Sequence, residues 1–312
     1  MTRCEGVSAG ASSRPASSAA APAGAVRLLA PAKLTLTLRI TGVRSDGYHF
    51  VDAEMVTLDL CDELVVHPSA VASVEVIPEA TAVDGADTGA ASWDIPSDHS
   101  NLVMRALELA GRTAHVVVRK RIPPGAGLGG GSADAAAVLR WANRLTAGEM
   151  ASTAAAGTTR RRRGQREPRT LVTPQMAATL GADVAFCLVG GRARVSGIGE
   201  VVDPLPFRAQ RFVLWMPPIA CDTAAVYSRW DALGGPAGAN NDLESAATSL
   251  YPELAQWRDE LARATGQPAQ LAGSGSTWFV TAPSGAAPFG GSERVRAPDG
   301  VRVVAAQALR PM

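Results

Sequence analysis

A glycine-rich segment places the strongest constraint on how this chain can fold. Residues 123–140 read PPGAGLGGGSADAAAVLR, with five glycines in the seven positions 125–131. The segment before it, HVVVRKRI, has the branched residues of a strand, and Ala133–Leu145 has the pattern of a helix. The sequence therefore predicts a strand, a turn whose bare backbone lies close to another group, and a helix. Glycine permits the close approach because it has no Cβ.

Neighbouring residues exclude two of the known kinds of glycine loop. Gly125, Gly127 and Gly130 have the spacing of a dinucleotide-binding loop, but that site needs a second strand ending in an acidic residue. No strand pattern precedes Glu149, the acidic residue at about the right distance. A P-loop needs a lysine after its glycines, and Ser132 follows here. A backbone cradle for phosphate at a helix start remains, beside a purely structural turn. Ser132 is suited to cap the helix, or to contact a phosphate or its magnesium ion.

The order of the other segments predicts an α+β fold, with strands grouped ahead of helices. Apolar and polar residues alternate after Val26, in VRLLAPAKLTLTLRITG, as in a half-buried strand. Further strands are predicted in AEMVTLDLCDELVVHP, ASVEVIP, RFVLWMPP and GVRVVAAQAL. Helices are predicted in SNLVMRALELAGR with Ser100 as N-cap, on either side of a turn at Gly181, and around 223–233 and 254–265. We place a domain boundary near residue 195.

Composition excludes several classes of function. The formal net charge is +1 and aromatic residues make up 5% of the chain, so neither nucleic acid nor a membrane is an expected partner. The four cysteines and four histidines are scattered, which predicts no disulfide framework, no zinc site and a reducing, cytoplasmic location. No segment is apolar enough for a transmembrane helix. Residues 1–25 are expected to form a disordered extension, and the arginine-rich run 158–169 a solvated loop.

Three segments, in this order, resemble the GHMP kinases, the superfamily of galactokinase, homoserine kinase and mevalonate kinase. They are PAKLTLTLRITGVRSDGYHF, PPGAGLGGGSADAAAVL and LAGSGSTWF. Within the superfamily, PAK followed by DGYH, with LGADVAF and NND farther on, resembles the kinases of 4-diphosphocytidyl-2-C-methyl-D-erythritol. The resemblance extends over the chain from about residue 26. The arginine-rich run 158–169 looks like an insertion relative to it.

The resemblance implies a fold and a reaction. The fold has two α+β domains, one like ribosomal protein S5 over 26–195 and one like ferredoxin over 196–312. In the reaction, ATP with Mg²⁺ phosphorylates the 2-hydroxyl of the cytidyl substrate, a step of the methylerythritol phosphate route to isopentenyl diphosphate. The enzyme is expected to be a monomer or a homodimer in the cytoplasm.

The resemblance also implies roles for individual residues. Asp183 corresponds to the general base that takes the hydroxyl proton, and Lys33 to its positively charged partner. Tyr48 and His49 correspond to the residues that bind cytosine, with Thr35, Gly273, Ser274 and Gly275 as further substrate contacts. The ATP-binding residues are Pro123, Pro124, Gly125, Ala126, Gly127, Leu128, Gly129, Gly130, Gly131, Ser132 and Ala133. The metal ligands are unknown.

This sequence departs from the family pattern at three positions. Thr35 stands where the family has asparagine, Ala185 where it has proline, and Trp278 where it has a small residue. Threonine keeps one hydroxyl but lacks the reach and the second polar atom of an amide. Two alternatives stay open: another GHMP kinase, of the homoserine or mevalonate type, and a member that binds nucleotide without turnover.

Overall fold

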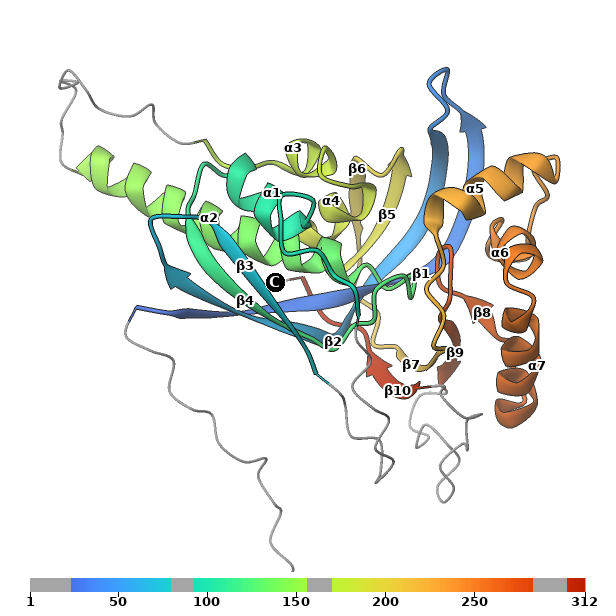
Figure 1. The fold of residues 1–312 in the computed structure, drawn as a ribbon. Helices are drawn as coiled ribbons and strands as arrows, with labels where there is room; N and C mark the ends of the chain where they lie inside the picture. The colour runs from blue at the N-terminus through green and yellow to red at the C-terminus, as the bar shows by residue number, and fades with distance from the viewer. Residues whose placement is uncertain (1–23, 80–92, 156–169, 283–301, 312) are drawn as a thin grey trace, which may run out of the picture.

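The computed structural model describes residues 24–79, 93–155, 170–282 and 302–311. Residues 1–23 of the predicted extension therefore lie outside the described residues. The arginine-rich run 158–169 lies outside them as well. The described residues form two sheets with helices on their faces (Figure 1). The predicted α+β class is confirmed.

The first sheet has the order β3-β4-β2-β5-β6, with β1 paired to β2. Its strands are β1 (Val26–Val43), β2 (His49–Pro68), β3 (Ser73–Pro78), β4 (Ala114–Lys120), β5 (Arg192–Gly197) and β6 (Val201–Leu205). Long β1 and β2 form an antiparallel hairpin, and the turn between them contains Gly47 at φ +88°. Only the β3–β4 pair of this sheet, among the described strands, is parallel.

Four helices cover one face of the first sheet (Figure 1). They are α1 (Leu102–Leu109), α2 (Gly130–Ala155), α3 (Pro174–Ala178) and α4 (Ala182–Val189). A core of mainly small and branched side chains, among them Val116 and Val138, joins the sheet to the helices together with the aromatic ring of Phe186. The many alanines of α2 let the helix lie close to β1, because a small side chain keeps the two backbones near one another.

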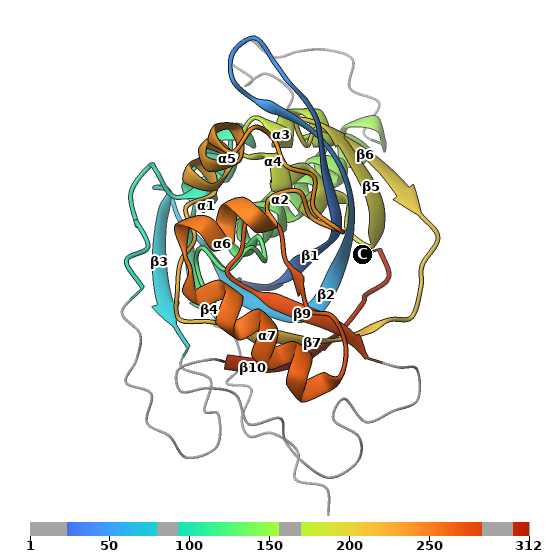
Figure 2. The same ribbon diagram turned by 90° about the vertical axis from the view of Figure 1, so that its right-hand side faces the viewer.

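The second sheet has the order β10-β7-β9-β8 and lies against the other face of β1 and β2. Its strands are β7 (Arg211–Met216), β8 (Gln270–Leu271), β9 (Trp278–Ala282) and β10 (Arg302–Gln307). Leu34 and Leu58 pack on Phe212 across the two sheets, so β1 is buried on both faces near residue 34. The helices α5 (Thr223–Ala232), α6 (Glu244–Leu250) and α7 (Glu253–Thr265) accompany this sheet, with α6 and α7 in front of it in Figure 2.

The structure corrects several local predictions. The first sheet continues past residue 195 because β6 pairs with β5, so the change of sheet falls between Leu205 and Arg211. Asn101, rather than Ser100, caps α1: its side chain accepts the N–H of Val103, while Ser100 binds Asp98. The helix after the glycine loop begins at residue 130 instead of 133, and α6 was not predicted. Glycine is a poor helix former, which hides the start of α2 in the sequence.

Candidate active site

A cavity of about 800 Å³ brings together most of the predicted site residues. Its walls come from β1, the β1–β2 turn, the glycine loop, the start of α4, α5 and the second glycine loop after β8. These segments are far apart in the sequence and meet where the two sheets and their helices adjoin (Figures 1 and 2). The cavity is therefore the candidate active site.

The first glycine loop forms one wall of this cavity. Gly125, Gly127 and Gly129 have positive φ angles of 67°, 75° and 66°, a region that side chains rarely adopt. A Cβ on Gly127 would collide with the carbonyl oxygen of Ala272 in the second loop. A Cβ on Gly129 would stand 2.8 Å from Cγ of Lys33. These glycines are thus required by protein groups that approach the backbone.

The start of α2 faces the same cavity. The first intrahelical hydrogen bond runs from the N–H of Ala133 to the carbonyl of Gly129, at 2.8 Å. The preceding N–H groups, of Gly130, Gly131 and Ser132, have no acceptor within the helix, and these three residues line the cavity. This end of the helix carries partial positive charge and suits an anion such as phosphate.

Two residues assigned to the loop contribute to its support instead of lining the cavity. Leu128 and Ala133 are fully buried in the cores on either side of the first sheet. The carbonyl of Leu128 accepts the N–H of Lys33 at 3.0 Å. The loop is therefore attached by its backbone to the strand that carries the predicted catalytic lysine.

The second glycine loop packs against the first. The N–H of Thr277 donates to the carbonyl of Ala126, and the hydroxyl of Ser274 lies 2.8 Å from that of Thr223. Gly273 and Ser274 line the cavity, and their role as substrate contacts stays a prediction. Gly275 instead faces Cys221 and Leu271 in the interior. Trp278 is fully buried in the core of the second sheet.

The structure places Lys33 and Asp183 side by side at the base of the loop. Nζ of Lys33 lies 3.3 Å from Oδ2 of Asp183 and donates to the hydroxyl of Thr35 at 3.0 Å. The side chain of Lys33 is 6% exposed, whereas that of Asp183 keeps 30% exposure and opens to the cavity. Asp183 stands in the first turn of α4, where a carboxylate is favoured by the helix dipole.

Tyr48 and His49 lie at another wall of the cavity, in different environments. Tyr48 is 60% exposed at the β1–β2 turn, and Arg44 stacks on its ring. The ring of His49 is enclosed: its Nε2 lies 2.9 Å from a carboxylate oxygen of Asp231, and its centroid 4.8 Å from that of Tyr227. This arrangement joins the hairpin to α5 and fixes the orientation of the imidazole.

Sequence reasoning missed residues that complete the site. Tyr227 lines the cavity, and burial together with the charge of Asp183 raises the pKa of its hydroxyl, which therefore stays protonated. Asn241, from the NND motif, is buried and donates to the carbonyls of Leu271 and Gly273 at 3.0 and 2.7 Å. It thereby holds the second loop in place. The NND motif marked Asn241 in the sequence, but its role in holding the second loop follows only from the fold.

A smaller cavity of about 200 Å³ adjoins the glycine loop. It shares Leu102, Pro124 and Gly131 with the large cavity. Val76 and Val118 supply further apolar walls, and Lys120 and Asp134 also line it. The two cavities therefore meet at the start of α2. A planar aromatic group in the smaller one would lie beside an anion bound at the helix.

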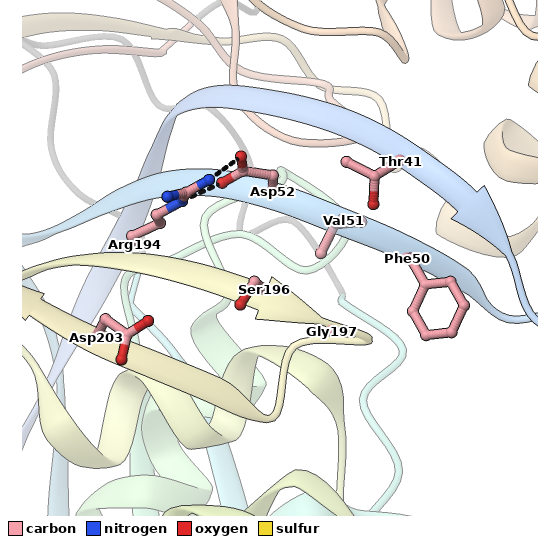
Figure 3. Close-up of a pocket in the computed structure, with 8 residues that line it drawn as sticks. All are labelled: Thr41, Phe50, Val51, Asp52, Arg194, Ser196, Gly197 and Asp203. Carbon is pink, nitrogen blue, oxygen red and sulfur yellow. Dashed lines mark hydrogen bonds and ion pairs between the residues drawn. The ribbon is translucent and has the colours of Figure 1, made fainter.

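A third cavity lies elsewhere, between the β1–β2 hairpin and the β5–β6 pair (Figure 3). It measures about 530 Å³ and is lined by Phe50, Asp52 and Arg194, among others. Arg194 donates two hydrogen bonds to Asp52, at 2.7 and 2.6 Å. The charges of Arg194 and Asp52 therefore satisfy each other.

Two features are absent from the described ranges of the chain. No helix there is long and apolar enough to span a bilayer. No three histidine, cysteine, aspartate or glutamate side chains gather there as metal ligands.

Comparisons with known proteins agree with the geometry. Residues 101–191 match the family described as the GHMP kinases N terminal domain. The chain is 32% identical to a 4-diphosphocytidyl-2-C-methyl-D-erythritol kinase from Paracoccus denitrificans, covering 91% of this chain and 97% of the relative. It is 35% identical to a protein of the same name from Pelotomaculum thermopropionicum, covering 81% and 88%.

Solved structures give the same result. A crystal structure of 4-(cytidine 5'-diphospho)-2C-methyl-D-erythritol kinase matches with a TM-score of 0.58 at 29% identity, over 90% of this chain and 98% of that one. A homoserine kinase from Cytophaga hutchinsonii matches at 0.54 and 17% identity, over 94% and 96%, which shows a common fold. The chain has the two-domain α+β fold of the GHMP kinases and belongs to the 4-diphosphocytidyl-2-C-methyl-D-erythritol kinase family.

Proposed function

We propose that this protein transfers the γ-phosphate of ATP to the 2-hydroxyl of 4-diphosphocytidyl-2-C-methyl-D-erythritol, giving the 2-phosphate and ADP. The observation that carries the proposal is the Lys33–Asp183 pair, which lies in one cavity with a helix start suited to an anion. The names of the relatives support this substrate over homoserine or mevalonate. The step belongs to the methylerythritol phosphate route to isopentenyl diphosphate.

The proposed chemistry follows from the positions of these two side chains. Asp183 accepts the proton of the substrate hydroxyl while the hydroxyl oxygen forms a bond to the γ-phosphorus of ATP. At the same time, the bond between the γ-phosphorus and the bridging oxygen breaks, and ADP leaves with that oxygen. Lys33 stabilises the ionised carboxylate and the charge that develops on the phosphate oxygens. In phosphoryl transfer, the protein contributes mainly by positioning and by electrostatic stabilisation.

Mg²⁺ is part of the proposal as a partner of ATP. It prefers oxygen ligands and keeps several waters, so phosphates and one or two side chains suffice to hold it. Ser132 is a cavity residue that offers a hydroxyl oxygen near the loop. Bound there, the ion would neutralise charge on the transferred phosphate.

The two ends of the cavity suit the two nucleotides. We place the phosphates of ATP at Gly130–Ser132 and the adenine in the adjoining apolar cavity, near Val76 and Val118. The cytosine of the other substrate is placed against Tyr48 and His49. The cytoplasmic location and the monomeric or homodimeric state stay predictions.

The direct test is an assay of purified protein with ATP, Mg²⁺ and the cytidyl substrate. We expect ADP and the 2-phosphate in equal amounts, with homoserine and mevalonate tested in parallel. If folded protein forms no phosphorylated product from the cytidyl substrate, the proposed function is wrong. Phosphorylation of homoserine or mevalonate alone would assign the alternative activity.

Tyr48→Ala is expected to raise the KM for the cytidyl substrate about tenfold, since stacking of a base on an aromatic ring contributes about 1–3 kcal/mol. The KM for ATP should stay unchanged, because Tyr48 lies at the β1–β2 turn. Steady-state kinetics with each substrate varied in turn measures both. Phe50→Ala, an exposed aromatic of the third cavity, is the matched control and should alter neither KM. Equal effects of the two variants would contradict the assignment.

Thr35→Val is expected to lower kcat about three- to tenfold, because the hydrogen bond that orients the ammonium of Lys33 is lost. Valine has nearly the shape of threonine, so the KM for ATP should change little. Thr35→Ser keeps the hydroxyl and should retain most of the activity. Full activity of Thr35→Val would show that the hydroxyl does not position the lysine.

A further inference from the structure

Three charged side chains are buried beneath the glycine loop, outside the Lys33–Asp183 pair. They are Asp62 on β2, Lys120 at the end of β4 and Asp134 near the start of α2. Their side chains are 0%, 5% and 6% exposed, respectively. Buried charges cost free energy, and a buried ion pair often contributes less to stability than apolar residues of the same size. Such a cluster therefore needs another explanation.

The contacts of Asp62 fix the chain where the loop begins. Its Oδ1 accepts the N–H groups of Arg121 and Ile122, at 2.5 and 2.9 Å. Its Oδ2 pairs with Nζ of Lys120. One carboxylate of the first sheet thus holds the backbone and the side chain at the point where β4 ends.

The ammonium of Lys120 extends this connection to the other end of the loop. Nζ also donates to Oδ2 of Asp134, at 2.7 Å. A Cβ on Gly130 would stand 3.0 Å from Nζ, so the lysine lies directly beneath the first turn of α2. The residues before and after the loop therefore meet at a single charged group.

We propose that Asp62, Lys120 and Asp134 position the ATP loop by fixing both of its ends to the first sheet. This inference rests on the proposed use of ATP. A loop that binds phosphate through backbone N–H groups gains affinity when those groups are held in place before binding. Lys120 and Asp134 also line the smaller cavity, where we place the adenine. No member of the cluster lines the larger cavity with the phosphate site, so toward the phosphates they act through the loop, as positioning residues.

The net charge of the cluster and its proposed positioning role predict opposite changes in ATP affinity when Asp134 is replaced. Two carboxylates and one ammonium lie under a site for anions, so their net charge alone would weaken ATP binding. Oδ1 of Asp134 has no hydrogen-bond partner among the described residues. Burial and the charge of Asp62 raise the pKa of Asp134 to about 7, against the effect of Lys120. Assays at pH about 8 therefore favour the ionised form of Asp134.

The experiment compares Asp134→Ala and Asp134→Asn with wild type at that pH. Both substitutions leave the Lys120–Asp62 pair intact, so neither leaves an uncompensated charge. We expect the KM for ATP to rise about tenfold in the alanine variant and about threefold in the asparagine variant, whose amide oxygen still accepts from Lys120. The kcat and the KM for the cytidyl substrate should stay within about twofold of wild type. Direct titration with a fluorescent ATP analogue should give the same order of affinities.

Thr146→Val is the matched control. Thr146 is buried on α2, about 18 Å along the helix from Asp134, and its hydroxyl accepts a hydrogen bond from Arg112. Loss of this hydrogen bond should lower the Tm and leave the KM for ATP unchanged.

An unchanged or lower KM for ATP in folded Asp134 variants would overturn the positioning role, as would an equal rise in both KM values. If the alanine variant does not fold, the asparagine variant decides. Inactive wild-type protein would count against the proposed function, while analogue binding would still test the cluster.

Discussion

Asp183→Asn is expected to lower kcat by about 10²- to 10⁴-fold, the usual contribution of a positioned general base. The amide keeps the shape of the side chain but does not accept the hydroxyl proton. ATP should bind with nearly unchanged affinity, because the phosphates are placed at the start of α2 and Asp183 belongs to α4. Single-turnover kinetics and titration with an ATP analogue measure the two effects separately.

Asp203→Asn provides the comparison for this variant. Asp203 is an exposed carboxylate of β6 that lines the third cavity, so its substitution should leave kcat unchanged. If Asp183→Asn retains activity near that of wild type, Asp183 is not the base. The proton would then pass to the phosphate or to water, and the Lys33–Asp183 pair would have only a structural role.

Local patterns in the sequence were sufficient to predict the strand, loop and helix around residue 130. Alternation identifies β1, and the branched residues before Pro123 identify β4, because strands and helices are specified by neighbours in sequence. The Lys33–Asp183 contact is different. In the sequence, Lys33 resembles an ordinary surface charge on a strand, and Asp183 resembles a helix cap. Only the resemblance to a family implied that the two residues pair. The fold brings them within 3.3 Å.

Contacts that depend on tertiary packing could not be predicted from the sequence pattern. The enclosure of His49 by Tyr227 and Asp231 arises because α5 packs against the β1–β2 hairpin. The cluster under the loop likewise joins Asp62 and Lys120 through strand pairing, and neither residue belongs to a recognisable motif. Such contacts require the register of β2 on β4, which one sequence does not specify.

Gly127→Ala is expected to be the most damaging change to the glycine loop. Gly127 has φ +75°, and a Cβ there would collide with the carbonyl oxygen of Ala272 and stand 2.7 Å from that of Gly275. A left-handed backbone costs a side chain about 1–2 kcal/mol, and overpacking adds about 1–3 kcal/mol. We expect the Tm to fall by about 5–15 °C. The affinity for an ATP analogue should fall at least about 100-fold, because the loops must separate.

Gly266→Ala separates the two causes. Gly266 ends α7 with φ +67°, and a Cβ added there would have no neighbour within 4 Å, so the substitution has the backbone cost without the collision. It should lower the Tm by only a few degrees, with about 1 kcal/mol of destabilisation, and leave the affinity for the analogue unchanged. Equal effects of the two variants on nucleotide affinity would mean that contact between the two glycine loops is unimportant. A larger effect of Gly127→Ala would show that the bare backbone at Gly127 serves that contact, and through it the shape of the phosphate site.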